Sequence, residues 1–159
     1  MKKIAMTGHT EGLGKILFDN FEIDGFSRSN GYNTNNVDHV ISTIKKYDIF
    51  INNVQHNQVD IAQKLWALWK DNPKKKIINI GSRAKDFIKT DYGFKKHMLS
   101  EFSKHANFNG DCRVSCVNFG YLNKLTDKQI IEAVSYVLNV DYIVEEITVF
   151  GYEDKHNNH

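Results

Sequence analysis

Three side chains in the middle of the sequence have the types and the spacing of an acid–base site. Tyr92 and Lys96 lie four residues apart within residues 92–105, whose apolar spacing predicts a helix. Positions i and i+4 share one face of a helix, so the phenol and the ammonium can point into one cleft. Ser82 follows the apolar run at 77–80, which predicts a strand buried on both faces. An ammonium beside a phenol lowers the tyrosine pKa from about 10, so Tyr92 could donate or remove a proton while Ser82 holds the reacting oxygen.

A glycine-rich turn near the start of the chain is the second group with chemical meaning. Residues 7–14 read TGHTEGLG, between a stretch that predicts a strand and one that predicts a helix. The first glycine permits a tight turn, the second lets the backbone approach a pyrophosphate, and the third lets the helix pack close to the strand. Free N–H groups at the helix N-terminus favour phosphate. The residues of this turn expected to form part of the cofactor site are Gly8, Thr10, Glu11, Gly12, Leu13 and Gly14.

The end of the second expected strand, at residues 23–27, bears on which dinucleotide is bound. An acidic residue at this point usually binds the ribose diol of NAD, and Asp24 lies too early to do so. Arg28 follows the strand end instead, where a guanidinium can bind a 2′-phosphate through paired hydrogen bonds. The hydroxyls of Ser27 and Ser29 could add donors. The sequence therefore predicts NADP(H) in preference to NAD(H).

The elements that must position these residues alternate between strands and helices. Strands are predicted at about 3–7, 23–27, 48–54, 77–80, 113–119 and 145–150, and helices at about 12–21, 39–47, 58–72, 92–105 and 126–139. This order predicts an α/β fold, a Rossmann-like doubly wound parallel sheet in three αβα layers. We expect one domain over residues 1–152 and a polar tail over 153–159. Ligands of such sheets bind beyond the carboxyl ends of the strands, so the motifs should meet there.

Local patterns also predict how three of the helices begin and pack. Asp38 is expected to cap the helix that follows it, and Thr126 with Gln129 resembles a capping box. The apolar residues expected on one face of the helix at 58–72 are Ile61, Leu65, Leu68 and Trp69.

Composition argues against several other kinds of protein. The net charge of the 159 residues is +2 and the lysines are scattered, which does not predict a nucleic-acid-binding surface. No apolar run approaches membrane-spanning length and the N-terminus leads directly into a strand, so we expect a cytoplasmic protein without a membrane contact. Cys112 and Cys116 are expected to be buried free thiols, and no residues have the spacing of a metal site.

Together these motifs resemble the short-chain dehydrogenase/reductase family. The resemblance covers about residues 1–120 and rests on the glycine turn, on Asn52 and Asn53 after the third expected strand, and on the ordered serine and YxxxK motif. It implies hydride transfer between a nicotinamide cofactor and a small-molecule carbonyl or alcohol. The residues to which it gives catalytic roles are Ser82, Tyr92 and Lys96, the last two also touching the cofactor. Further cofactor contacts are implied at Asn53, Val54, Gly120 and Leu122.

The chain departs from the pattern of this family in several places. Residues 52–55 read NNVQ in place of the usual NNAG. The nearest candidate for the supporting asparagine of the family is Asn57. The proline expected before Gly120 is replaced by Phe119, and so few residues follow Leu122 before the next helix that the usual substrate lid is almost absent. A site without a lid would be open to water, which weakens electrostatic stabilisation.

Two functions therefore compete. The leading hypothesis is an NADP(H)-dependent oxidoreductase, and the alternative is a non-catalytic NADP(H)-binding sensor or regulatory protein that keeps the fold. A related enzyme acting on a nucleotide sugar or a pterin would need an enlarged C-terminal region, which this chain lacks. The resemblance also implies a homodimer or homotetramer, paired through the helices at 58–72 and 92–105. The aromatic residues that either form this interface or belong to the core are Trp66, Trp69, Phe94 and Phe102.

Overall fold

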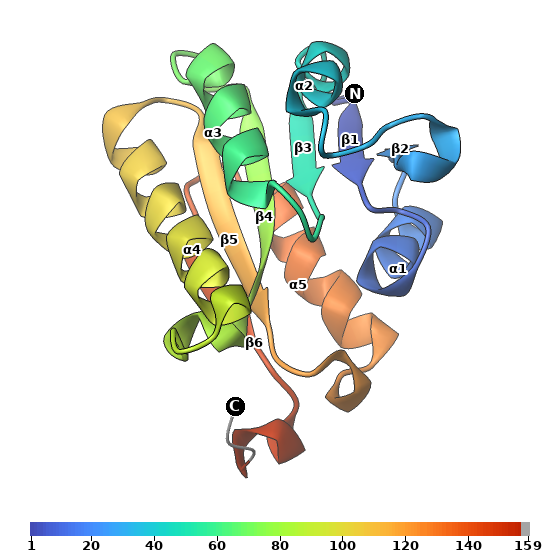
Figure 1. The fold of residues 1–159 in the computed structure, drawn as a ribbon, viewed down its shortest axis with the longest axis vertical. Helices are drawn as coiled ribbons and strands as arrows, with labels where there is room; N and C mark the ends of the chain where they lie inside the picture. Colours follow the sequence, from blue (N-terminus) through green and yellow to red (C-terminus); the bar gives the residue numbers. More distant parts are fainter. Residues whose placement is uncertain (157–159) are drawn as a thin grey trace.

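The computed structural model describes residues 1–156 and contains a six-stranded parallel sheet in the order β2-β1-β3-β4-β5-β6 (Figure 1). The strands are β1 Ile4–Thr7, β2 Asp24–Phe26, β3 Ile49–Asn52, β4 Lys76–Ser82, β5 Arg113–Phe119 and β6 Glu146–Val149. The α-helices are α1 Gly12–Asn20, α2 Val37–Ile44, α3 Gln58–Trp69, α4 Asp91–Asn109 and α5 Asp127–Asn139. Four short 3-10 helices join them: η1 Arg28–Asn30, η2 Arg83–Asp86, η3 Leu122–Lys124 and η4 Tyr152–His156. The predicted fold class is confirmed.

Helices cover both faces of the sheet because successive strand residues point to opposite sides. Phe50 and Ile77 belong to a core shared with the buried residues of α2, α3 and α4. Ile49, Ile51 and Ile78 belong to a second core, shared with α1 and α5. Figure 1 shows α3 and α4 lying across one face of the central strands. The result is the expected three-layer αβα arrangement.

The predicted cap of α2 is wrong. The side chain of Asn36, not Asp38, accepts the backbone N–H of His39 at 3.3 Å, and the helix begins at Val37. Val37, which precedes the predicted cap, is the first helical residue and packs against the first core. Asp38 lies in the first turn and forms an exposed ion pair with Lys64 at 2.9 Å.

Other helix details were predicted more closely. Gln129 N–H donates to Thr126 Oγ1 at 3.2 Å and Thr126 N–H donates to Gln129 Oε1 at 2.9 Å, so the predicted capping box is confirmed. On α3 the predicted buried face is correct except for Leu68, which is 59% exposed at the edge of the stripe. Trp69 and Phe102 belong to the core, whereas Phe94 is 49% exposed.

Residues 153–156, placed in the polar tail by the sequence, are part of η4. Asp154 is fully buried there, and its Oδ2 accepts the backbone N–H of Tyr121 at 2.7 Å. The rest of the predicted tail, 157–159, lies outside the described residues. The C-terminal segment is therefore attached to the loop that follows β5.

Within residues 1–156, no helix is long and apolar enough to span a membrane, and no cluster of acidic, histidine or cysteine side chains could hold a metal ion. Cys112 and Cys116 are buried free thiols, as predicted. Burial raises the pKa of both thiols to about 12, so both stay protonated and unreactive at neutral pH.

Candidate active site

A cleft of about 730 Å³ opens beyond the carboxyl ends of β1 to β5, where the fold leads one to expect a ligand. The predicted site residues that line it are Gly8, Thr10, Glu11, Gly12, Leu13, Ser27, Arg28, Ser29, Asn53, Val54, Ser82, Tyr92, Lys96, Gly120 and Leu122. The lining residues that had not been assigned a role are Phe26, Tyr32, Thr34, Gln55, His56, Ile80, Gly81 and Phe119. The structure thus brings motifs from all parts of the chain into one cavity.

The glycine turn is built by close backbone contacts. Gly8 has φ +67°, and a Cβ on Gly14 would lie 1.7 Å from the carbonyl oxygen of Gly8. Gly14 therefore does not line the cleft; it lets α1 begin against the turn. Asn53 at the end of β3 holds the turn in place, since its Nδ2 donates to the Gly8 carbonyl at 3.1 Å and its N–H donates to Thr7 Oγ1 at 3.2 Å.

The turn fits the phosphates of a dinucleotide. Gly12 has φ +56°, and apart from its chain neighbours and the adjacent backbone of α1, no atom of the described residues lies within 4 Å of the place that a Cβ would take. The N-cap residue of α1, Glu11, makes no side-chain cap bond, so the first N–H groups of the helix remain available to an anion. The backbone here offers both space and donors, as a bound pyrophosphate requires.

The loop after β2 forms the next part of the cleft. Ser27 begins η1, its N–H donates to Asn30 Oδ1 at 2.7 Å, and its hydroxyl lies 2.7 Å from that of Ser29. This short, internally bonded loop presents Arg28 to the cavity. Asp24 is turned elsewhere and accepts the hydroxyl of Tyr47 at 2.7 Å. No carboxylate from the end of β2 therefore competes with Arg28 for the ligand.

The catalytic candidates line the far end of the cleft. Ser82 Oγ accepts the N–H of Ala84 at 3.1 Å, which leaves its hydroxyl proton free to be donated to a ligand. Tyr92 lies in the first turn of α4 and is 56% exposed. Lys96 Nζ lies 5.4 Å from the centre of the Tyr92 ring, and burial lowers the pKa of Lys96 to about 8. The predicted sharing of one helix face is confirmed.

Sequence reasoning missed one polar residue next to Lys96. Asn57, the nearest candidate for the supporting asparagine, does not line the cleft and donates to the carbonyl of Thr34 at 3.1 Å. The next residue, Gln58, is buried, and its Oε1 accepts from Lys96 Nζ at 2.7 Å. The signal was present in the sequence, because Gln58 is a polar residue on the apolar face that continues through Ile61.

The C-terminal segment supports the loop that lines the cleft after β5. Gly120 N–H donates to the Val149 carbonyl at 2.9 Å, and a Cβ on Gly120 would lie 2.2 Å from Asp154 Oδ2. Arg83 donates to the backbone carbonyl of Asp154 at 3.1 Å and lies over the Phe150 ring at 3.9 Å. The segment that contains η4 therefore supports the loop after β5 from the side of Asp154.

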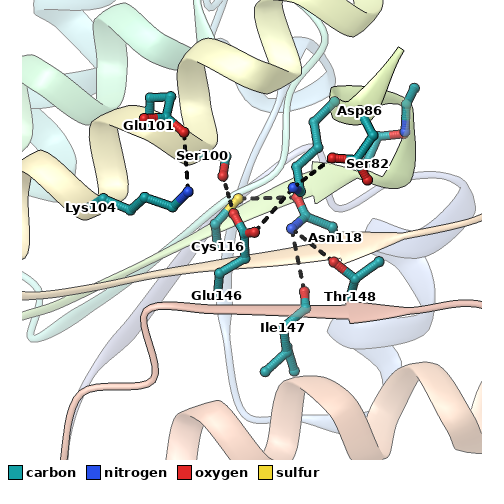
Figure 2. A network of polar contacts seen from close by, with 12 residues as sticks. Ser82, Asp86, Ser100, Glu101, Lys104, Cys116, Asn118, Glu146, Ile147 and Thr148 are labelled. Atoms are coloured by element: carbon teal, nitrogen blue, oxygen red, sulfur yellow. Dashed lines mark hydrogen bonds and ion pairs between the residues drawn. The ribbon is translucent and has the colours of Figure 1, made fainter.

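A partly buried polar network next to Ser82 ties η2 and α4 to the edge strand β6 (Figure 2). Lys85 Nζ lies 3.0 Å from Asp86 Oδ1 and 3.1 Å from Glu146 Oε1, and the Ser100 hydroxyl donates to Glu146. Although burial raises it, the pKa of Glu146 is lowered overall by the Ser100 hydrogen bond and the Lys85 ammonium. The carboxylate therefore stays charged and keeps η2 in place.

Comparisons with known proteins agree with this geometry. No family model and no curated protein sequence matches the chain. Serine dehydrogenase from Escherichia coli has a similar structure, with TM-score 0.72, 15% identity, and coverage of 92% of this chain and 96% of that one. 3-Ketoacyl-(acyl-carrier-protein) reductase from Brucella melitensis, solved with NADH, has TM-score 0.70 and 16% identity, with 96% and 98% covered.

The chain has the fold of the short-chain dehydrogenases and reductases. A short-chain dehydrogenase/reductase of the glucose/ribitol dehydrogenase type from Brucella melitensis is also similar, with TM-score 0.70, 10% identity, and 94% and 95% covered. At identities of 10 to 16%, these similarities show a shared fold and do not extend to substrate or reaction.

Proposed function

We propose that the protein is an NADP(H)-dependent oxidoreductase that reduces a carbonyl group or oxidises an alcohol. The observation that carries this proposal is that Ser82, Tyr92 and Lys96 line the same cleft as the glycine turn. A phosphate-binding turn alone would support only binding, and a Tyr–Lys pair alone is common. Their convergence at one edge of the sheet supports a cofactor and an acid–base group acting on one substrate.

Each side chain has a defined part in the proposed reaction. A nicotinamide dinucleotide, when bound, supplies or accepts the hydride. Tyr92 donates a proton to the carbonyl oxygen during reduction and removes it during oxidation. Lys96, whose ammonium lies 5.4 Å from the Tyr92 ring centre, places a positive charge beside the oxygen on which negative charge develops during that transfer. Ser82 donates a hydrogen bond to the same oxygen and fixes its position.

Arg28 supports the preference for NADP(H). It is presented to the cleft by a rigid loop, while the carboxylate of Asp24 is engaged by the Tyr47 hydroxyl at 2.7 Å. A guanidinium can pair with a 2′-phosphate through two parallel hydrogen bonds. A ribose diol, which needs an acceptor, finds no carboxylate at the end of β2.

The test of catalysis is turnover by wild-type protein and by Tyr92→Phe. A panel of aldehydes and ketones is supplied with NADPH, and the loss of reduced cofactor is followed by absorbance. Removing one hydroxyl should lower kcat by roughly 10²- to 10⁴-fold and leave NADPH binding unchanged. Equal turnover by the two proteins would refute the role given to Tyr92.

The exposure of Tyr92 supports a second candidate, a non-catalytic NADP(H) sensor. Its side chain is 56% exposed, so water reaches the proposed acid–base group. Such a protein would bind the dinucleotide tightly and turn over no substrate in the panel. Because both functions predict unchanged NADPH binding in Tyr92→Phe, turnover by the wild-type protein is the measurement that separates them.

We further propose a cytoplasmic homo-oligomer paired through α3 and α4. The exposed apolar side chains on these helices are Leu68, Phe94, Met98 and Phe108, at 59%, 49%, 42% and 90%. Exposed apolar side chains on the two helices that the family uses for pairing are candidates for such an interface. The two unpaired thiols suit a reducing compartment. Light scattering after size exclusion tests the assembly: Phe94→Glu should shift an oligomer toward the monomer, and a wild-type monomer would contradict it.

A further inference from the structure

Gln58 closes a small hydrogen-bonded triangle behind the proposed catalytic lysine. Its side chain is 8% exposed at the start of α3. Its Nε2 donates to the backbone carbonyls of Asn52 and Ile80, both at 2.8 Å, and its Oε1 accepts from Lys96 Nζ at 2.7 Å. The Ile80 carbonyl also accepts from Lys96 Nζ, at 3.3 Å. One amide therefore joins the ends of β3 and β4 to the ammonium on α4.

The chemistry of the neighbours fixes which way this amide points. Backbone carbonyls only accept hydrogen bonds, so the NH₂ group of Gln58 must face Asn52 and Ile80. The ammonium of Lys96 only donates, so the carbonyl oxygen of Gln58 must face it. A carboxylate at position 58 would place one of its oxygens beside the carbonyl oxygens of Asn52 and Ile80, with no proton to share between them. An apolar side chain would remove all three of these hydrogen bonds.

We propose that Gln58 is a positioning residue that holds the Lys96 ammonium at the cleft without cancelling its charge. Gln58 and Ile80 engage two of the three N–H donors of Lys96, which leaves one to face the cleft. A carboxylate partner would hold the ammonium equally well but would offset its field at Tyr92. The neutral amide of Gln58 holds the Lys96 ammonium in position and leaves its positive charge uncompensated. This inference rests on the role proposed above for Lys96.

The other groups around Lys96 do not supply this support. On its own helix the nearest titratable group is Tyr92, whose ring centre lies 5.4 Å from Nζ. From β5 the thiol of Cys116 faces it, and burial raises the pKa of that thiol to about 12, so it is uncharged at neutral pH. Gln58 is thus the side-chain acceptor that the described part of the chain offers to the ammonium.

The experiment is to titrate Lys96 directly by NMR in protein labelled with ¹³C-lysine, with its signal assigned by comparison with Lys96→Arg. The test variant is Gln58→Met, which keeps the length and removes both polar groups. The matched control is Gln63→Met, on the exposed face of the same helix. A hydrogen bond to an ammonium stabilises its charged form, so Gln58→Met should lower the Lys96 pKa by about one unit and the control should not change it.

An unchanged Lys96 pKa in folded Gln58→Met would overturn the inference and assign Gln58 a purely structural role at the start of α3. If that variant does not fold, Gln58→Glu replaces it: the added carboxylate should raise the Lys96 pKa by a unit or more, and no rise would equally overturn the proposal. Neither readout needs turnover. A shifted lysine in a protein without reductase activity would therefore refute the proposed function and leave the positioning role standing.

Discussion

The two ends of the cleft are held together by different means. At the phosphate end, the backbone of α1 packs directly against the backbone of the glycine turn. A Cβ on Gly14 would lie 1.7 Å from the Gly8 carbonyl oxygen. At the catalytic end, side chains from distant segments meet: Gln58 holds Lys96, and Asp154 holds the N–H of Tyr121. Adding a side-chain atom should therefore disrupt the phosphate end, whereas removing a polar group should disrupt the catalytic end. The following predictions test this difference.

Gly14→Ala should have the largest effect. Its single added carbon cannot fit beside the Gly8 carbonyl, so the turn must open, at a cost of about 3 kcal/mol in the free energy of unfolding. Dinucleotide binding should fall below detection in calorimetry because the phosphate site is built from this turn. The control is Gly31→Ala, at φ +92° with open space around it, which should cost only about 1 kcal/mol. Equal losses for the two variants would contradict the close-contact account.

Asp154→Ala tests the opposite sensitivity at the other end. Loss of the carboxylate removes the hydrogen bond from the Tyr121 N–H and the 3.8 Å ion pair with Arg83, and should lower the free energy of unfolding by roughly 2 kcal/mol. Asp154→Asn keeps an acceptor for Tyr121 and should recover part of this loss. Chemical denaturation measures both, and an Asp154→Ala protein as stable as wild type would show that η4 does not support the loop after β5.

The pH dependence of Lys96 should have opposite signs for activity and stability. Lys96 has a pKa of about 8 in the fold against an ordinary value of 10.5, because burial disfavours its charge. Reduction should therefore slow as pH rises through about 8 and the ammonium loses its proton. Between about 8 and 10.5 the unfolded chain keeps a proton that the folded protein has released, so the stability should rise over this range.

Lys96→Met should remove this part of the stability rise, as followed by denaturation at a series of pH values. Lys95→Met is the control, since Lys95 is exposed and paired with Asp91 at 3.1 Å. A rise that is the same in all three proteins would mean that Lys96 is not the group responsible.

Glu11→Gln should have the smallest effect. This exposed carboxylate at the N-cap of α1 adds negative charge where phosphates are expected, so its removal should tighten dinucleotide binding by about threefold at low salt. The gain should shrink at high salt, where exposed charges are screened. Glu22→Gln, at an exposed position beyond the C-terminal end of α1, is the control in the same titration. Weaker binding by Glu11→Gln would mean that this carboxylate contacts the ligand.

The same difference explains how much the sequence could predict. The glycine turn and the Tyr92–Lys96 pair are local patterns, so residue spacing on one turn or one helix was enough to place them. Gln58 reaches a partner 38 positions away, and Arg83 reaches the Asp154 backbone 71 positions away. Such contacts depend on how β3, β4 and the C-terminal segment come together, which no local spacing reports. The α2 cap was missed for a different reason: Asn36 and Asp38 are both residue types that cap helices, and only the fold shows that Asn36 accepts the N–H of His39.

Calorimetric titration with NADPH, NADP⁺, NADH and NAD⁺ tests the central claim most directly, with wild-type protein and Arg28→Ala compared. The account predicts tight binding of the two phosphorylated dinucleotides, weakened at least about tenfold in Arg28→Ala, because a charge-assisted bidentate pair is lost. Binding of the two that lack the phosphate should change little. If no dinucleotide binds the wild-type protein, the account is contradicted for both the oxidoreductase and the sensor.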